Sequence, residues 1–304
     1  MASAVLHALV LLVASAIVGS LQAGPVVRTG DPYKRGYTDA DFPRVQRLTG
    51  GVYTYEQLRS AGAEKLTTVS PFVVTTAGVL VADGQGSVAD TQRLIEAIAK
   101  VTTQPITHVV IGSDHGDHTA GNRAFPRGVT YLVHPTSQAI LSIPGATLVT
   151  DRTTIRLGQT EIQVCFLGRA HTGGDLSVYL PKDKILFMSE AYLNRIFPAM
   201  RSAYPSEWVA TIERAQAMDV ETYVPGHGFV ETPVVLKEEL ETFRRAIGQV
   251  IAEARRLRAR GLDADAAATQ AVFGDLETWS LRASQGATAI RRVYLELDGK
   301  LPRR

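Results

Sequence analysis

The chain has 304 residues, of which 45% are hydrophobic and 20% are charged, values typical of a globular protein with a large core. Its 32 basic and 30 acidic residues leave a formal net charge of +2, which excludes a strong basic field and argues against a nucleic-acid partner. Cys165 is the only cysteine, so an intramolecular disulfide is also excluded.

The N-terminal segment has the pattern of a leader. Residues 1–23 contain no Asp, Glu, Lys or Arg, and their apolar run is too short for a comfortable membrane span. This predicts a signal peptide and a periplasmic or secreted protein, with no stable membrane insertion once the signal is removed. An uncleaved anchor stays an alternative, because the bulky Leu21 stands just before the best cleavage point, after Ala23. Residues 24–50, rich in Pro, Gly, Arg and Asp, predict an extended N-terminal arm.

Residues 51–232 predict a domain of mixed α and β structure. Short β-branched runs at Val69–Thr75 and Gly78–Asp83 indicate a hairpin, and helical spacing follows over Ala89–Val101. His108–Ile111 is a continuous apolar run, typical of a strand buried on both faces. Further strands are predicted at Thr130–Val133, Thr147–Thr150, Glu161–Phe166, Leu176–Leu180, Ile185–Met188 and Thr222–Val224. Cys165 falls in one of these strands, which favours a buried thiol.

The pattern changes after residue 232. From Val234 to Arg260 apolar residues recur roughly every three to four positions, and Gly261 ends the run. Ala264–Val272 and the segment around Ile290–Leu297 predict two shorter helices. Residues 233–304 are therefore expected to form a C-terminal helical extension.

Candidate metal ligands stand directly after the buried strand, where residues 113–118 read Ser-Asp-His-Gly-Asp-His. Imidazole and carboxylate groups are the usual zinc ligands, and loops at strand ends are where sites are built. His115, Asp117 and His118 are therefore candidate ligands. The alternative for this segment is a solvated polar loop.

Two further histidines lie in glycine-containing turns after predicted strands. His171 stands in Ala-His-Thr-Gly-Gly, and His227 stands between Gly226 and Gly228. Each alone is as consistent with a turn histidine as with a ligand. Because strand ends of one sheet tend to converge, three such turns together favour a shared site.

In their order, these motifs resemble the metallo-β-lactamase superfamily over Val52–Val230. His115, Asp117 and His118 match its first element, His171 its second and His227 its last. Flanking segments also match, namely Asp83-Gly84, Thr119-Ala120-Gly121-Asn122 and Leu186-Phe187-Met188. The resemblance implies an α/β fold, the four-layer αββα sandwich, and bound zinc.

Two positions depart from that family's pattern. Ser113 stands where the first histidine is expected, and Glu190 stands where many hydrolytic members have a bridging aspartate. The resemblance implies one site at His115 and His171, weakened by the serine, and a tighter site at Asp117, His118 and His227. Glu190 carries the donor atoms needed to bridge them, so one or two zinc ions are expected.

The family's chemistry implies a hydrolase in which metal-bound hydroxide attacks a carbonyl of a small-molecule substrate, such as a β-lactam, lactone, ester or thioester. Asp117 is the expected catalytic residue, which orients the hydroxide and moves its proton. Asn122, Asn194 and Arg195 lie close in sequence to the metal motifs and are candidate substrate contacts.

Two other interpretations stay open. One is an iron oxygenase on the same fold, as in the persulfide dioxygenases, although Ser113 and Glu190 replace two of the three ligands that those enzymes use. The other is a metal-binding or partner-binding protein that has lost catalysis, with the helical extension as its interface. The sequence leaves the substrate, the number of metals and the oligomeric state open.

Overall fold

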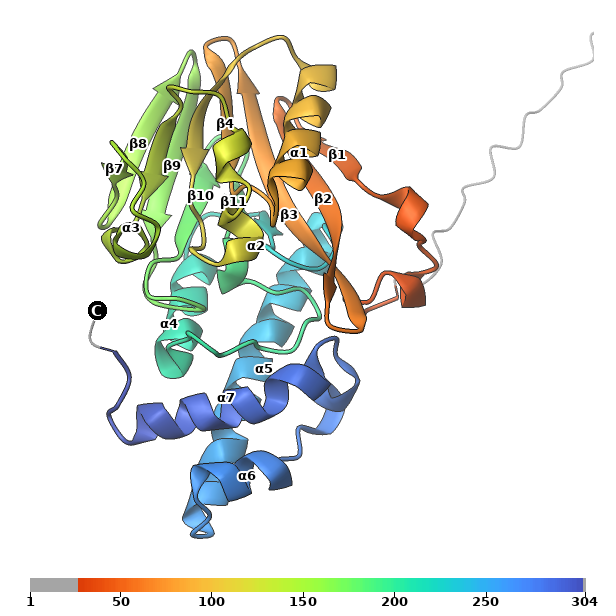
Figure 1. Cartoon of the computed structure of the whole chain (residues 1–304), viewed down its shortest axis with the longest axis vertical. Coiled ribbons are helices and arrows are strands. Elements are labelled where there is room, and N and C mark those ends of the chain that lie inside the picture. The colour runs from red at the N-terminus through yellow and green to blue at the C-terminus, as the bar shows by residue number, and fades with distance from the viewer. Residues whose placement is uncertain (1–26, 303–304) are drawn as a thin grey trace, which may run out of the picture.

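The computed structural model describes residues 27–302, so the expected signal peptide at residues 1–23 lies outside the described residues. Two β-sheets pack face to face, with helices on both outer faces (Figure 1). This is the predicted four-layer αββα sandwich. The fold class is therefore confirmed, including the helices that follow the sandwich at the C-terminus.

The first sheet has seven strands in chain order. Its first four strands pair antiparallel, and from β4 onward the pairs are parallel. The strands are β1 (Arg44–Thr49), β2 (Val52–Ala61), β3 (Glu64–Thr75), β4 (Gly78–Ala82), β5 (Ile106–Val110), β6 (Thr130–Val133) and β7 (Thr147–Leu148).

The second sheet has five strands in the order β12-β11-β10-β9-β8. Strands β11 and β12 form the one parallel pair of this sheet, so the chain leaves both strands in the same direction. The strands are β8 (Arg152–Leu157), β9 (Thr160–Phe166), β10 (Leu176–Leu180), β11 (Ile185–Phe187) and β12 (Thr222–Val224). Cys165 is a buried free thiol on β9, as expected.

Strand β4 shows how the layers are held together. Successive residues of a strand point to opposite faces. Val79 and Val81 pack in the core beneath α1 with Leu94 of that helix, whereas Leu80 and Ala82 belong to the core between the two sheets. Burial on both faces explains why this segment reads as an uninterrupted apolar run.

Helices cover the outer faces and one end of the sandwich. Ser87 caps α1 by accepting a hydrogen bond from the Asp90 backbone N–H, and Pro233 opens the long helix α5, which packs against β12. Helices α6 and α7 lie together at the lower end of the molecule in Figure 1. The helices are α1 (Val88–Val101), α2 (Gly116–Thr119), α3 (Pro135–Leu141), α4 (Pro205–Gln216), α5 (Pro233–Ala259), α6 (Ala264–Gln270) and α7 (Arg282–Leu297).

Helix α7 begins earlier than the sequence pattern predicted, at Arg282 rather than near Ile290. Within residues 27–302, no helix combines the length and the apolar character needed to cross a membrane.

Regular structure begins earlier than the expected end of the arm at residue 50. Arg44–Thr49 forms the edge strand β1, paired antiparallel with β2. Its side chains alternate between half-buried and exposed, and Val45 on it is 44% exposed, so it carries no apolar periodicity to recognise. Backbone pairing to the edge of β2, rather than side-chain burial, accounts for this strand.

Glu56 on β2 is fully buried, and Arg44 lies 3.6 Å from its Oε2. Burial raises the pKa of Glu56 to about 7, because the nearby Arg44 charge only partly offsets it. Between the ordinary pKa of 4.5 and about 7, the folded protein therefore holds a proton that the unfolded chain releases. The contribution of Glu56 must make the fold less stable as pH rises through this window.

We predict that Glu56→Gln reduces the loss of stability between pH 5 and pH 8 by up to a few kcal/mol, since each pKa unit corresponds to about 1.4 kcal/mol. Urea unfolding of both proteins at the two pH values measures this difference. The exposed Glu96→Gln on α1 serves as the control. An unchanged pH dependence in Glu56→Gln would show that this carboxyl is ionised in the folded protein throughout.

Candidate metal centre

The candidate ligands come from loops that follow four strands at one edge of the sandwich. His115, Asp117 and His118 follow β5, and His171 follows β9. Glu190 lies in the short 3-10 turn after β11, and His227 follows β12. Because β5 belongs to one sheet and the other three strands to the second, the site spans both sheets.

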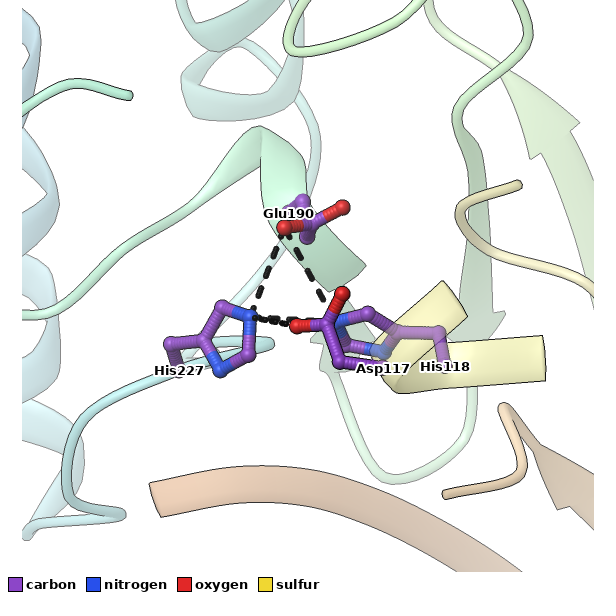
Figure 2. A group of neighbouring side chains, drawn as sticks. All are labelled: Asp117, His118, Glu190 and His227. Atoms are coloured by element: carbon purple, nitrogen blue, oxygen red, sulfur yellow. Dashed lines mark hydrogen bonds and ion pairs between the residues drawn. The ribbon is translucent and has the colours of Figure 1, made fainter. Parts of the chain in front are cut away.

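Asp117, His118, Glu190 and His227 form a first group, turned toward one another in Figure 2. His227 Nε2 lies 3.0 Å from Asp117 Oδ2, 3.4 Å from Glu190 Oε1 and 3.2 Å from His118 Nε2. His118 is fully buried and His227 nearly so. One ion could contact all four side chains, because their ligand atoms lie within 4.8 Å of one another.

His115, His171 and Glu190 form a second group. His115 Nδ1 lies 2.9 Å from Glu190 Oε2, and His171 Nε2 lies 3.2 Å from Glu190 Oε1. The two imidazole nitrogens are 3.1 Å apart. Glu190 belongs to both groups, as its predicted bridging position requires.

Two outer contacts orient the imidazoles of the first group. His118 Nδ1 lies 3.1 Å from Asp83 Oδ2, and His227 Nδ1 lies 2.8 Å from the Thr67 carbonyl oxygen. These contacts leave Nε2 of each ring facing the cluster, the arrangement by which outer partners fix metal-binding histidines. Asp83 was not among the predicted site residues. The sequence feature that could have identified Asp83 is the Asp-Gly pair directly after β4.

Close backbone packing explains the glycines around His227. The Gly226 N–H donates to the Ser189 carbonyl, and a Cβ on Gly226 would lie 2.4 Å from the Ser189 carbonyl carbon. Gly228 has φ +88°, and its Cβ would lie 2.2 Å from the Asn194 carbonyl oxygen. The Gly-His-Gly turn thus lets His227 approach the loop that carries Glu190.

Charges within the cluster stabilise one another. Burial opposes ionisation of Glu190, but His171 and His115 hold its pKa well below the usual range. Burial would lower the pKa of His115, yet the Glu190 charge raises it to about 9. Burial likewise opposes a charge on His227, but hydrogen bonds to Asp117 and Glu190 raise its pKa to about 9.

Asp117 also stays ionised. Burial and the Glu190 charge favour its neutral form, but the hydrogen bond from His227 and the His118 and His227 charges hold its pKa below the ordinary value. The pKa of His171 is lowered, chiefly by burial. Without a metal, protons on the imidazoles balance the two carboxylates.

The donor set fits a divalent metal such as zinc. Imidazole nitrogens and carboxylate oxygens are its usual protein ligands. In each group two imidazole nitrogens lie within 3.2 Å of each other, so a proton or a cation must separate their lone pairs. His171 Nδ1 is buried and has no hydrogen-bond partner among residues 27–302, which leaves Nε2 as the atom aimed at the cluster.

A cavity of about 180 Å³ opens over both groups. Residues outside the predicted set contribute cations and an amide to its wall: Arg59 from β2, Arg201 from the segment before α4, and Gln285 from α7. Arg59 and Gln285 lie far from the metal motifs in the chain, whereas Arg201 lies in the segment between Glu190 and α4. None of the three belongs to a motif, so no local pattern identified them.

The three expected substrate contacts do not line this cavity. Asn122 packs against Gly84, and Asn194 Nδ2 donates to the Phe229 carbonyl at 2.8 Å. Arg195 has φ 58° and turns its guanidinium to Glu239, at 2.5 Å and 3.0 Å. The backbone after β11 turns Asn194 and Arg195 away from the cluster, whereas Asn122 follows α2, so proximity in sequence did not place these three side chains on the cavity wall.

Comparison with known proteins gives one consistent result. The chain is 24% identical to a metallo-β-lactamase type 2 of Bacillus sp. (strain 170), over 66% of this chain and 82% of that protein. It is 22% identical to the metallo-β-lactamase type 2 of Elizabethkingia meningoseptica, over 60% of this chain and 78% of that protein. No protein-family model matches the chain.

Among solved structures, a metallo-β-lactamase from Pontibacter korlensis aligns with a TM-score of 0.59 and 22% identity, over 66% of this chain and 98% of that protein. These relatives, together with the clustered histidines and carboxylates, support the expectation of a metal-dependent hydrolase. The chain has the metallo-β-lactamase fold, and its predicted resemblance to the metallo-β-lactamase superfamily is confirmed.

Proposed function

We propose that this chain is an exported zinc-dependent hydrolase that attacks a carbonyl of a small, negatively charged substrate, such as a β-lactam, lactone, ester or thioester. The observation that carries the proposal is a pair of histidine groups sharing Glu190 beneath an open cavity. Export rests on the sequence of residues 1–23 alone. The names of the relatives make a β-lactam the first substrate to test.

In this proposal, Asp117, His118 and His227 would hold one zinc ion, His115 and His171 would hold a second, and Glu190, which belongs to both groups, could contribute to either. When bound, zinc supplies an activated water near neutral pH and polarises the substrate carbonyl. Asp117 is ionised and borders the cavity, so it can orient that water and accept its proton. The buried imidazoles would hold the ions in place.

The cavity wall favours an anionic substrate. Arg201 is exposed, and its side chain forms no hydrogen bond or ion pair with any residue in the range 27–302. An arginine fork matches a carboxylate in charge and geometry. Gln285 adds an amide to the same wall, so the substrate is expected to carry a carboxylate beside its reactive carbonyl.

Ser113 and Glu190, the two departures from the family pattern, fit each other. Ser113 is fully buried, and its hydroxyl donates to Glu190 Oε2 at 2.5 Å. The small serine leaves room for the longer carboxylate arm and orients it toward His115. The serine therefore supports the bridging position of Glu190 rather than marking a lost site.

The first prediction from the proposed function concerns turnover. The zinc-loaded protein should hydrolyse at least one member of a chromogenic panel of lactam, lactone, ester and thioester substrates, with metal content measured alongside. His118→Ala should abolish metal-dependent turnover, whereas His108→Asn, on β5 but outside both groups, should retain it. Full zinc occupancy without turnover on any substrate would contradict the hydrolase proposal and favour a metal-binding protein.

A second prediction concerns substrate charge. Arg201→Gln should raise KM about tenfold for an ester that carries a carboxylate and leave kcat unchanged, because the contact acts in the ground state and the transition state alike. The neutral methyl ester of the same compound should show no change. Arg127→Gln, an exposed arginine outside the cavity, is the matched control. Equal effects on the charged and neutral esters would rule out carboxylate recognition by Arg201.

A third prediction tests the fit of Ser113 with Glu190. Ser113→His alone should destabilise the fold by about 1–3 kcal/mol, because it overpacks a fully buried position. Adding Glu190→Asp, which removes one methylene, should recover much of that loss. Urea unfolding of the two single variants and the double variant measures the coupling. Strictly additive effects would mean that the two side chains are accommodated independently.

A further inference from the structure

Arg59 joins the metal centre to a hairpin that the sequence analysis did not connect with it. It lies near the end of β2, where β2 and β3 turn back on each other, and its side chain is 33% exposed. Its guanidinium Nη1 forms an ion pair with Asp117 Oδ2. A residue on a surface hairpin thus reaches one of the candidate ligands.

Arg59 pairs with the same Asp117 oxygen that would contact a metal ion bound to the first group. Asp117 Oδ2 lies 3.0 Å from His227 Nε2 and 3.8 Å from His118 Nε2, so it faces the two imidazoles. A guanidinium keeps its positive charge at any ordinary pH. A divalent cation on the same oxygen would repel it strongly in this partly buried site.

We infer that Arg59 is a latch: it holds Asp117 in the metal-free centre and is displaced when a metal ion binds to Asp117. Arg59 is thus a positioning residue, and it lowers the affinity of the first group for metal. The inference rests on the proposed metal site, but it does not depend on hydrolysis.

The displaced side chain has space to move. Arg59 and Asp117 line both the cavity over the metal groups and a neighbouring cavity of about 400 Å³. The second cavity is bordered by polar side chains, with Gln57, Gln85 and Asp90 among them. The Arg59–Asp117 pair lines both cavities, so a guanidinium displaced from the metal groups finds polar partners in the second cavity.

If Arg59 instead orients Asp117 for metal binding, its removal should change the metal affinity in the opposite direction. A group that hydrogen-bonds to a ligating carboxylate can also orient it, and removal of such a partner typically weakens metal binding 10- to 100-fold. A latch, by contrast, competes with the metal, so its removal should strengthen binding. The sign of the change in metal affinity therefore separates the two roles.

The test is a zinc titration of the metal-free protein against a chromogenic chelator, with folding checked by circular dichroism. Arg59→Met should bind the first zinc ion about tenfold more tightly than the wild type, because one nearby positive charge is removed. Arg59→Lys keeps the charge and should remain close to the wild type. Arg201→Met also removes a cation from the same cavity. Because Arg201 forms no ion pair with Asp117 within residues 27–302, this variant should change zinc affinity little.

Weaker or unchanged zinc binding by Arg59→Met would overturn the latch. Because the readout is zinc affinity, it is independent of turnover. A wild type that hydrolyses nothing, combined with tighter zinc binding by Arg59→Met, would refute the proposed function and leave the latch standing. If neither the wild type nor Arg59→Met binds zinc, both the latch and the proposed metal centre are wrong.

Discussion

The shared carboxylate of Glu190 is the interaction on which the site depends. Its oxygens face His115, His171 and His227 at 2.9, 3.2 and 3.4 Å, although the residue is only 4% exposed. A buried charge is tolerated only when it is paired, and these imidazoles supply the partners. Conversely, without Glu190 neither His115 nor His171 would have a carboxylate within ion-pair distance among residues 27–302, and only the first group would keep such partners, in Asp117 and Asp83. Glu190 thus makes two histidine groups into one centre.

The sequence identified the ligand candidates because each stands at the end of a strand, and strand ends converge. It could not identify Arg59 or Gln285, since a hairpin and a distant helix bring them to the cavity. It assigned Arg195 to the substrate because that residue follows Glu190 closely in the chain. The left-handed backbone at Arg195 and its ion pair with Glu239 could not be anticipated from a local pattern. Local sequence patterns thus predict the candidate ligands better than they predict the residues that line the cavity.

The segment before β1 supports the loop that carries His227. Tyr37 stacks on Phe229 with ring centroids 5.4 Å apart, and the Arg35 guanidinium lies 4.2 Å from the centre of the same ring. Phe229 is buried two positions after His227. Because Arg35 also forms an ion pair with Glu231, the segment contacts this loop at both Phe229 and Glu231. Residues expected to form an extended arm therefore help to fix a candidate ligand.

The C-terminal extension also contributes to the site. The Leu281 N–H donates to Glu64 Oε1 at 2.8 Å, and Glu64 begins β3 at the tip of the hairpin that carries Arg59. Gln285, one turn into α7, lines the cavity beside that hairpin. A hairpin tied to the extension has a restricted position, so less backbone freedom is lost when Arg59 pairs with Asp117. The extension therefore bears on the metal centre through the hairpin, and substitutions at its contact with Glu64 should act on the same residue pair that we infer to control metal binding.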